Sequence, residues 1–258
     1  MIRLPEKFIQ RMSQTLSGDL EDFLASYDKP PVRGVRANLL KTSPEELKSL
    51  LAYKIERSKI LEEGFVLNES PDGIGNDPYH IAGLFYIQEP SAMAPIAAAE
   101  INPGMKVLDI CAAPGGKSCL MAEMMQGTGR VQAWELHPHR ADLIAAQVQR
   151  LGLENVRPMT RDALKHREEL DGTMDIVLLD APCSGLGVMS EKPDVKYRVT
   201  AQSVDELVQL QSNLLDAVCP YVKKGGTLVY STCSVLKDEN VRQAEKFLAR
   251  HPEFELLP

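Results

Sequence analysis

Between residues 106 and 232, short apolar runs alternate with segments of helical period. The runs are apolar at successive positions, which is typical of strands buried on both faces of a sheet. Strands that alternate with helices are joined by right-handed crossovers and lie parallel. We therefore expect strands at 106–112, 129–135, 155–160, 174–180 and 225–232, and helices at 116–126, 138–151, 163–170, 201–219 and 237–250.

The pattern before residue 75 is different. Two short amphipathic helices are expected within residues 5–27, followed by extended segments within 29–40, 54–60 and 64–67. A further helix begins after Ser43, because Ser43 can cap it, Pro44 suits its first position and Glu46 can close a capping box. The turn-rich stretch "NESPDGIGNDP" then places a boundary near residue 75.

The predicted fold class is thus α/β. A doubly wound, Rossmann-like sheet is expected over residues 76–258, and a small α+β domain over residues 1–75.

Composition narrows the class of protein. The five cysteines show no paired spacing, which argues against a disulfide framework and a zinc cluster and indicates reduced thiols in a cytoplasmic protein. No apolar run is long enough to cross a bilayer. Oligomeric state is not visible in the sequence, and a monomer is the default.

Charge is distributed unevenly along the chain. The net charge is −7, but residues 1–60 hold 11 Lys and Arg against 8 Asp and Glu. A surface that tracks a nucleic-acid backbone is therefore expected in the amino-terminal part, with a solvated mixed-charge surface as the alternative. The candidate contacts are Arg33, Arg36, Lys41, Lys54, Arg57 and Lys59.

A nucleotide-like site is expected where the first strand of the large sheet ends. Gly115 and Gly116 allow a ligand to approach the backbone at a helix start, but the spacing lacks the dinucleotide fingerprint. Glu135, Asp162 and Asp180 end the next three strands, and an acid at the position of Glu135 suits a ribose. A ribose-bearing cofactor without a pyrophosphate fits, and S-adenosylmethionine is the candidate. The predicted cofactor residues are Cys111, Ala112, Ala113, Pro114, Gly115, Gly116, Lys117, Glu135, Asp162 and Asp180. For Lys117, contact with the cofactor carboxylate and a capping role in the loop are equally open.

Two cysteines follow strands directly. A thiolate that adds to carbon 6 of a pyrimidine makes carbon 5 nucleophilic enough to accept a methyl group. We assign the attack to Cys233, because a helix start follows it. Cys183 is assigned to assist proton removal and release, and Asp180 to protonate ring nitrogen 3. Cys111, Cys119 and Cys219 are interpreted as packing residues.

The chain closely resembles the Nop/Sun family of RNA cytosine-5 methyltransferases in four motifs: "YIQEPSAMAP", "VLDICAAPGGK", "DIVLLDAPCSGLGVM" and "LVYSTCSVLKDEN". The spacing of these motifs resembles the bacterial branch that acts on 16S ribosomal RNA (RsmF-like). The resemblance implies S-adenosylmethionine at residues 111–117, Glu135, Asp162 and Asp180. It also implies Cys233 as the nucleophile, Cys183 as the residue for release, and an amino-terminal RNA-binding module that matches residues 1–75.

The end of the sequence departs from that pattern. Methyltransferase sheets of this type usually finish with two further strands, and RsmF-like proteins carry additional RNA-binding domains, so a carboxy-terminal truncation is expected after "FELLP". Three alternatives remain: a transfer RNA cytosine-5 methyltransferase, an exocyclic-amine methyltransferase, and a non-catalytic RNA-binding assembly factor. Cys183 stands where an amine methyltransferase usually carries an aromatic residue.

Overall fold

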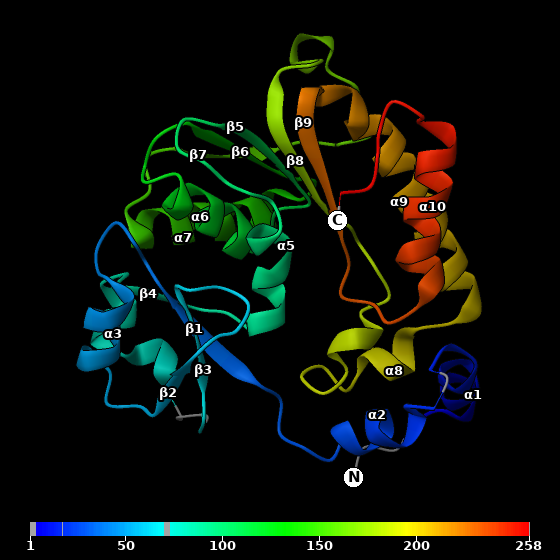
Figure 1. Ribbon diagram of the computed structural model, residues 1–258, viewed down its shortest axis with the longest axis horizontal. Helices are drawn as coiled ribbons and strands as arrows, with labels where there is room; N and C mark the ends of the chain where they lie inside the picture. Colours follow the sequence, from blue (N-terminus) through cyan, green and yellow to red (C-terminus); the bar gives the residue numbers. More distant parts are fainter. Residues whose placement is uncertain (1–3, 17, 70–72, 258) are drawn as a thin grey trace. The chain divides into compact units, whose positions relative to one another are not determined.

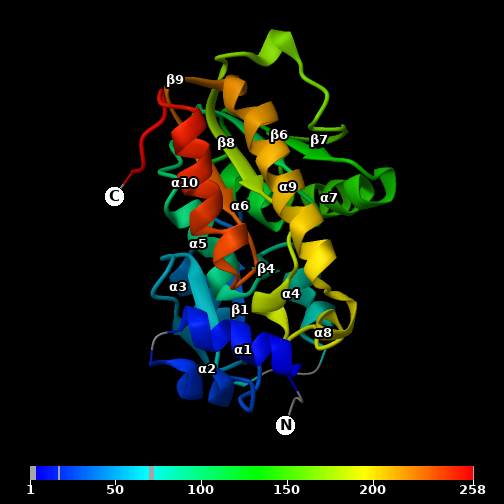
Figure 2. The ribbon, with the colours of Figure 1, turned by 90° about the vertical axis from the view of Figure 1, so that its right-hand side faces the viewer.

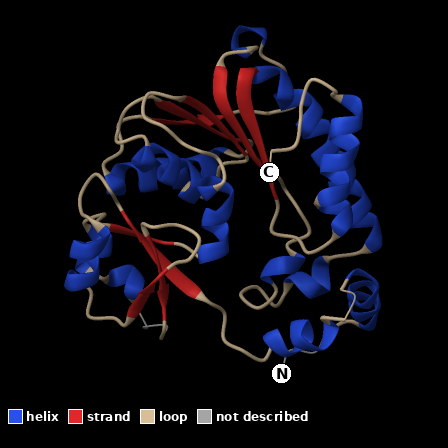
Figure 3. Cartoon of the chain, in the orientation of Figure 1, coloured by secondary structure: helices blue, strands red, loops and turns tan. Residues whose placement is uncertain are grey.

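The chain forms two compact units, each assembled from segments distant in the sequence. The computed structural model describes residues 4–16, 18–69 and 73–257. The first unit, here called the helical unit, comprises Met1–Pro31, Ala181–Asp216 and Ser231–Pro258. The second, the two-sheet unit, comprises Val32–Asp180 and Ala217–Tyr230. Figure 3 shows the two groups of strands that give the second unit its name.

The larger sheet of the two-sheet unit has the strand order β7-β6-β5-β8-β9. Strand β5 pairs in parallel with β6 and β8, and β6 pairs in parallel with β7. The strand order reverses at β5, the arrangement of a doubly wound sheet, so the predicted α/β fold class is confirmed. The strands are β5 (Lys106–Ile110), β6 (Arg130–Glu135), β7 (Val156–Thr160), β8 (Met174–Asp180) and β9 (Val222–Ser231).

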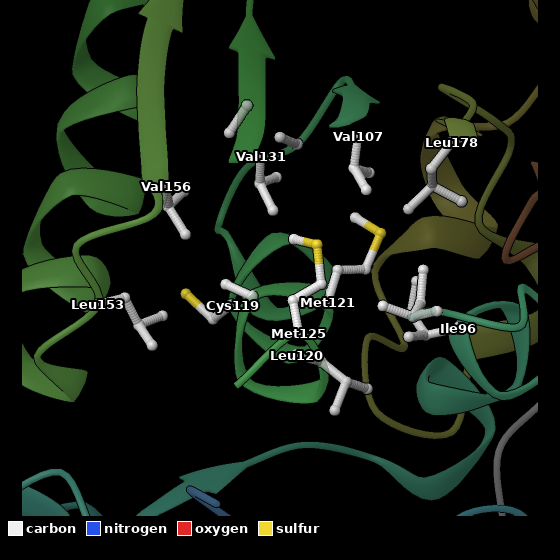
Figure 4. Packing of buried hydrophobic residues seen from close by; sticks show 14 of the residues in the cluster. Ile96, Val107, Cys119, Leu120, Met121, Met125, Val131, Leu153, Val156 and Leu178 are labelled. Carbon is white, nitrogen blue, oxygen red and sulfur yellow. The ribbon is translucent and has the colours of Figure 1, made fainter. Parts of the chain in front are cut away.

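Two helices, α6 (Gly116–Met124) and α7 (Pro138–Leu151), lie side by side on one face of this sheet (Figure 1). Helix α6 is buried almost throughout, and its Met121 and its C-cap residue Met125 extend toward strand side chains such as Val131 and Leu178 (Figure 4). Helix α7 begins with proline and ends at Gly152, whose φ of 73° allows the left-handed stop.

The smaller sheet has the order β2-β3-β1-β4, with antiparallel pairings. Helix α3 (Pro44–Leu50) packs beside it, and Ser43 caps this helix as predicted, accepting a hydrogen bond from the Glu46 N–H at 3.1 Å. The Glu46 carboxylate accepts a hydrogen bond from the Thr42 hydroxyl. The strands are β1 (Arg33–Ala37), β2 (Ile55–Arg57), β3 (Gly64–Leu67) and β4 (Phe85–Ile87).

The predicted helix at 163–170 is wrong. Only a single 3₁₀ turn forms there, because Asp162 Oδ1 accepts a hydrogen bond from the Leu164 N–H and turns the chain away from a helical start. The short helical elements of the two-sheet unit are η1 (Ile74–Asn76), α4 (Pro78–Ile81), η2 (Pro90–Met93), α5 (Ala94–Ala97), η3 (Glu168–Leu170) and η5 (Cys219–Tyr221).

Helices dominate the helical unit. Phe8 and Met12 of α1 pack into one apolar cluster with Leu186, Met189, Val204 and Leu236. Helices α9 and α10 run side by side (Figures 1 and 2), and Gln243 Nε2 of α10 donates a hydrogen bond to the Val208 carbonyl of α9. The elements are α1 (Glu6–Thr15), α2 (Leu20–Ser26), η4 (Leu186–Val188), α8 (Val195–Arg198), α9 (Ala201–Val218), η6 (Lys237–Glu239) and α10 (Val241–Arg250).

A buried ion pair joins the smaller sheet to helix α6, which packs on the larger sheet. Arg36 of β1, which we predicted as a nucleic-acid contact, is fully buried and pairs with Glu123 of α6. The prediction for Arg36 is therefore wrong, because a guanidinium sealed in this way cannot reach a phosphate. Lys41, another predicted contact, donates to the carbonyls of Ala82 and Arg150 at 2.8 and 3.1 Å.

The smaller sheet also takes β4 from beyond residue 75. The domain boundary near that residue stays a prediction. Across the described part of the chain, no helix combines the length and the apolar character that crossing a membrane requires.

Candidate functional site

The predicted cofactor loop, residues 111–117, leads directly from β5 into α6. Cys111 has a φ of 60°, and Gly115, with a φ of 104°, stands immediately before the helix. A side chain at Gly115 would be strained by this φ and would lie 3.2 Å from Ile144 of α7. The turn therefore brings the backbone N–H groups at the start of α6 to the carboxyl-terminal edge of the larger sheet, where ligands bind in such folds.

Glu135 offers a buried oxygen for a ligand. Its side chain is only 2% exposed, and Oε1 accepts from the His137 N–H at 3.2 Å and from Arg140 Nη1 at 3.4 Å. Oε2 is buried and has no hydrogen-bond donor among the described residues. A buried carboxylate oxygen without a partner is costly, and a ribose hydroxyl would satisfy it. The residue thus fits the ribose-bearing group predicted for this position.

The two other predicted acids lie in more polar settings. Asp162 is about one-third exposed and holds the turn at Leu164. Asp180, the last residue of β8, pairs with Lys117 of α6, with 2.7 Å between Nζ and Oδ2. This ion pair gives Lys117 a partner that neither of its two predicted roles included.

Behind the loop, β5 carries a second buried acid. Asp109 is fully buried, and the Ser118 hydroxyl of α6 donates to its Oδ2. Burial raises the pKa of Asp109 to about 7, despite the opposing hydrogen bond from Ser118. A carboxyl group in this state links the strand to the helix that carries the cofactor loop.

Cys183 and Cys233 meet in the helical unit. Their sulfur atoms lie 3.1 Å apart, and the Cys233 N–H donates to Cys183 Sγ at 3.3 Å. Cys233 is exposed and Cys183 is partly buried. The hydrogen bond with Cys233, together with burial, raises the pKa of Cys183, so Cys183 keeps its proton. The pair therefore places a protonated thiol beside the exposed sulfur of Cys233.

A buried carboxylate that the sequence analysis missed holds both cysteine loops. Glu239 Oε1 accepts hydrogen bonds from the Ser184 N–H at 2.8 Å and from Gln211 Nε2 at 3.1 Å. Its Oε2 accepts from the hydroxyls of Ser184 and Ser234. Each serine follows one of the two cysteines in the chain. Glu239 had no recognisable signal, because its partners lie up to 55 positions away and come together only in the fold.

The loops also touch each other directly. The Gly187 N–H donates to the Cys233 carbonyl at 2.9 Å, and a Cβ atom at Gly187 would lie 2.7 Å from that oxygen. Real Cβ atoms do not approach so closely, so this contact requires glycine.

The remaining cysteines behave largely as predicted. Cys119 and Cys219 are buried, in agreement with a packing role. Cys111 is partly exposed, and burial, with the nearby charge of Glu135, raises its pKa to about 12. An inert thiol at this position is compatible with a structural place in the cofactor loop.

Two family models match the chain. Residues 97–258 match "16S rRNA methyltransferase RsmB/F", and residues 4–90 match the "N-terminal domain of 16S rRNA methyltransferase RsmF". The chain belongs to the RsmB/F family of 16S rRNA methyltransferases. The resemblance drawn from the motifs is thereby confirmed.

RsmB/F relatives cover most of the chain. It is 37% identical over 230 residues to the probable ribosomal RNA small subunit methyltransferase B of Bacillus subtilis, covering 88% of this chain and 51% of that protein. It is 35% identical over 260 residues to ribosomal RNA small subunit methyltransferase F of Cronobacter sakazakii, covering 97% and 54%. The chain thus spans about half the length of these curated relatives.

Solved structures agree with this family. One titled as PH0851 is 32% identical, with a TM-score of 0.93, over 99% of this chain and 58% of that one. A methyltransferase homolog protein from Pyrococcus horikoshii is 33% identical, with a TM-score of 0.85, over 96% and 79%. The fold of these two structures is therefore shared by nearly the whole chain.

Proposed function

We propose that this chain is the catalytic part of an S-adenosylmethionine-dependent RNA cytosine-5 methyltransferase that acts on 16S ribosomal RNA through a covalent adduct at Cys233. The observation that carries the proposal is the approach of the Cys183 and Cys233 sulfur atoms to 3.1 Å. Two thiols at this distance suit a reaction that needs both a nucleophile and a second group to complete the cycle.

Cys233 forms the covalent bond. Its thiolate adds to carbon 6 of the cytosine, and electron density then gathers on carbon 5 and on ring nitrogen 3. Exposure of Cys233 supports this role, because a base must reach the sulfur. The target base leaves its stack to do so, as in other enzymes that act on a nucleobase.

Asp180 and Cys183 are assigned to the steps in which protons move. Asp180, with the Lys117 ammonium bonded to it, is assigned to nitrogen 3, where a proton offsets the charge that develops on the ring. Cys183 is assigned to assist the final step, in which a base from solvent takes the proton from carbon 5. The electron pair of that C–H bond re-forms the double bond between carbons 5 and 6, so the bond between carbon 6 and Cys233 breaks and the Cys233 thiolate is restored. The raised pKa of Cys183 makes it the poorer source of a thiolate, which supports the assignment of the attack to Cys233.

Residues 111–117, Glu135, Asp162 and Asp180 are assigned to S-adenosylmethionine. Bound there, the cofactor supplies an electrophilic methyl group. The free buried oxygen of Glu135 would accept hydrogen bonds from its ribose, and the N–H groups at the start of α6 would face its polar end. A cytoplasmic location fits the proposed substrate. The RNA-binding role of residues 1–75 remains part of the proposal, with the exposed Arg33, Lys54 and Lys59 as its candidates.

Replacement of Cys233 tests the proposal. Cys233→Ala should abolish transfer of a tritiated methyl group to cytosine in 16S ribosomal RNA, while Cys219→Ala, a packing cysteine, serves as the matched control. An enzyme that methylates an exocyclic amine, or a non-catalytic assembly factor, would not respond to this change. Transfer of methyl groups only to transfer RNA by the unaltered chain would redirect the substrate assignment and leave the chemistry intact.

A further inference from the structure

A polar cavity of about 430 Å³ lies in the helical unit, between α1 and the segment 236–242. Four cations line it, Lys7, Arg11, Lys237 and Arg242, against the one carboxylate of Asp238. This excess of positive charge is notable in a chain whose net charge is −7. A concentrated positive site in an acidic protein indicates a specific anionic ligand rather than a general affinity for polyanions.

Helix α1 presents two different faces. Phe8 and Met12, four residues apart, are buried in the apolar cluster of the helical unit. The cavity is lined from a neighbouring stripe of the same helix, by Lys7, Gln10, Arg11, Gln14 and Thr15. The apolar face thus fixes the helix, and its polar face is left to the cavity.

Asp238 orients the two arginines of the cavity. Arg11 Nη2 donates to Oδ2 at 2.5 Å, and Arg242 Nη1 donates to Oδ1 at 2.6 Å. The hydrogen bond from Arg242, with that from Arg11, lowers the pKa of Asp238 and keeps it charged. Each guanidinium has five N–H donors, so most remain for a ligand. Within residues 4–16, 18–69 and 73–257, neither Lys7 nor Lys237 forms an ion pair.

The cavity wall belongs to the loop of the proposed nucleophile. Leu236, which lines the cavity, lies three residues after Cys233, and its N–H donates to Ser234 Oγ at 3.1 Å. Asn240 Nδ2 donates to the Ser234 carbonyl at 2.8 Å. These bonds close residues 234–240 into a compact turn, so Lys237, the one cation on this turn, keeps a fixed position relative to Cys233.

We propose that this cavity binds the phosphodiester backbone of the RNA strand that carries the target cytosine. The choice of RNA as the ligand rests on the proposed function. The choice of phosphate rests on the paired arginines, because planar guanidinium groups match phosphate oxygens in geometry. Anchoring the backbone next to the nucleophile's loop holds the strand while the base is turned toward Cys233.

Binding of a fluorescein-labelled, cytosine-containing single-stranded oligoribonucleotide tests the inference by fluorescence anisotropy across a series of salt concentrations. The double variant Lys7→Gln/Lys237→Gln removes the two cations without an ionic partner and leaves the arginine pair in place. Its matched control, Lys106→Gln/Lys224→Gln, removes the same charge from exposed lysines where β5 and β9 begin, away from the carboxyl edge of that sheet.

We expect the Lys7→Gln/Lys237→Gln variant to bind the RNA about tenfold more weakly at moderate salt, with a salt dependence shallower by about 0.7 per lost phosphate contact. The control should bind like the unaltered chain. Equal affinity and equal salt dependence in both variants would overturn the inference, as would undetectable binding by the unaltered chain at low salt. Loss of methyl transfer in Cys233→Ala is independent of both outcomes, so the two proposals fail separately.

Discussion

Ser184 donates both of its hydrogen-bonding groups to Glu239, the backbone N–H to Oε1 at 2.8 Å and the hydroxyl to Oε2 at 2.5 Å. Ser234, after the second cysteine, donates to the same carboxylate. A single buried side chain therefore sets the spacing of two loops whose cysteines have to act together. Glu239 is a positioning residue, since it acts through the serines that follow the two cysteines.

Glu239→Gln should lower kcat by at least about tenfold and leave cofactor affinity unchanged. The amide group of glutamine faces donors on Ser184 and Ser234, and a buried donor without an acceptor costs about 1–3 kcal/mol. Steady-state kinetics and calorimetric titration with S-adenosylhomocysteine check the two parts. Glu245→Gln, an exposed change on α10, is the control. An unchanged kcat in Glu239→Gln would remove its positioning role.

Cys183→Ala should trap the enzyme on its RNA. The Cys233 bond to carbon 6 still forms, but its release lacks the thiol that lies 3.1 Å away. We expect a slow-migrating protein–RNA band on a denaturing gel, and turnover lower by about 10² to 10⁴, the usual contribution of a positioned proton-transfer group. The band should be missing in Cys183→Ala/Cys233→Ala. A band that persists in that double variant would contradict the assignment of the attack to Cys233.

Glu135→Gln should weaken binding of S-adenosylhomocysteine about tenfold to a hundredfold, because a hydrogen bond to a charged acceptor contributes about 1.5–3 kcal/mol. Isothermal titration calorimetry measures the change, with exposed Glu154→Gln as the control. Binding that is equal in the two variants would show that the free Oε2 of Glu135 does not face the ribose.

Asp109→Asn should change how stability depends on pH. The folded chain holds the Asp109 proton up to about pH 7, whereas an unfolded aspartate releases it near its ordinary value of 3.8. The contribution of Asp109 to the free energy of unfolding is complete below the unfolded pKa of 3.8. It falls as pH rises from that value to the folded pKa of about 7, by up to about 1.4 kcal/mol for each pH unit.

The asparagine variant does not titrate, so its melting temperature relative to the unaltered chain should rise between about pH 4 and about pH 8. Thermal melts at both values, with exposed Asp142→Asn as the control, test this. A difference that does not vary with pH would mean that Asp109 is ionised throughout.

The strands of the larger sheet were predictable because their burial leaves a direct mark on the sequence. Residues such as Val177 and Leu178, adjacent in β8, are both fully buried, so the run is apolar without alternation. The acids at strand ends were also predictable, since parallel strands end at one edge. The prediction of a helix at 163–170 failed because its hydrophobic pattern is short and the hydrogen bond that the Asp162 side chain accepts from the Leu164 N–H decides the local conformation.

Arg36 and Glu239 show what a sequence does not reveal. Both are charged residues that the fold buries completely, each satisfied by partners remote in the chain. Composition places such residues on the surface, because charged side chains are rarely buried without a partner. Their partners become known only from the three-dimensional structure.

At Gly187, the short approach to the Cys233 carbonyl has a consequence for sequence variation. Its φ lies outside the left-handed region, so the backbone itself would accept other amino acids. Other residues are excluded at position 187 only because their Cβ atom would collide with the Cys233 carbonyl oxygen. A saturation library at this codon should recover glycine as the sole functional residue, and a methyl group as small as that of alanine would push the sulfur-bearing segment out of alignment.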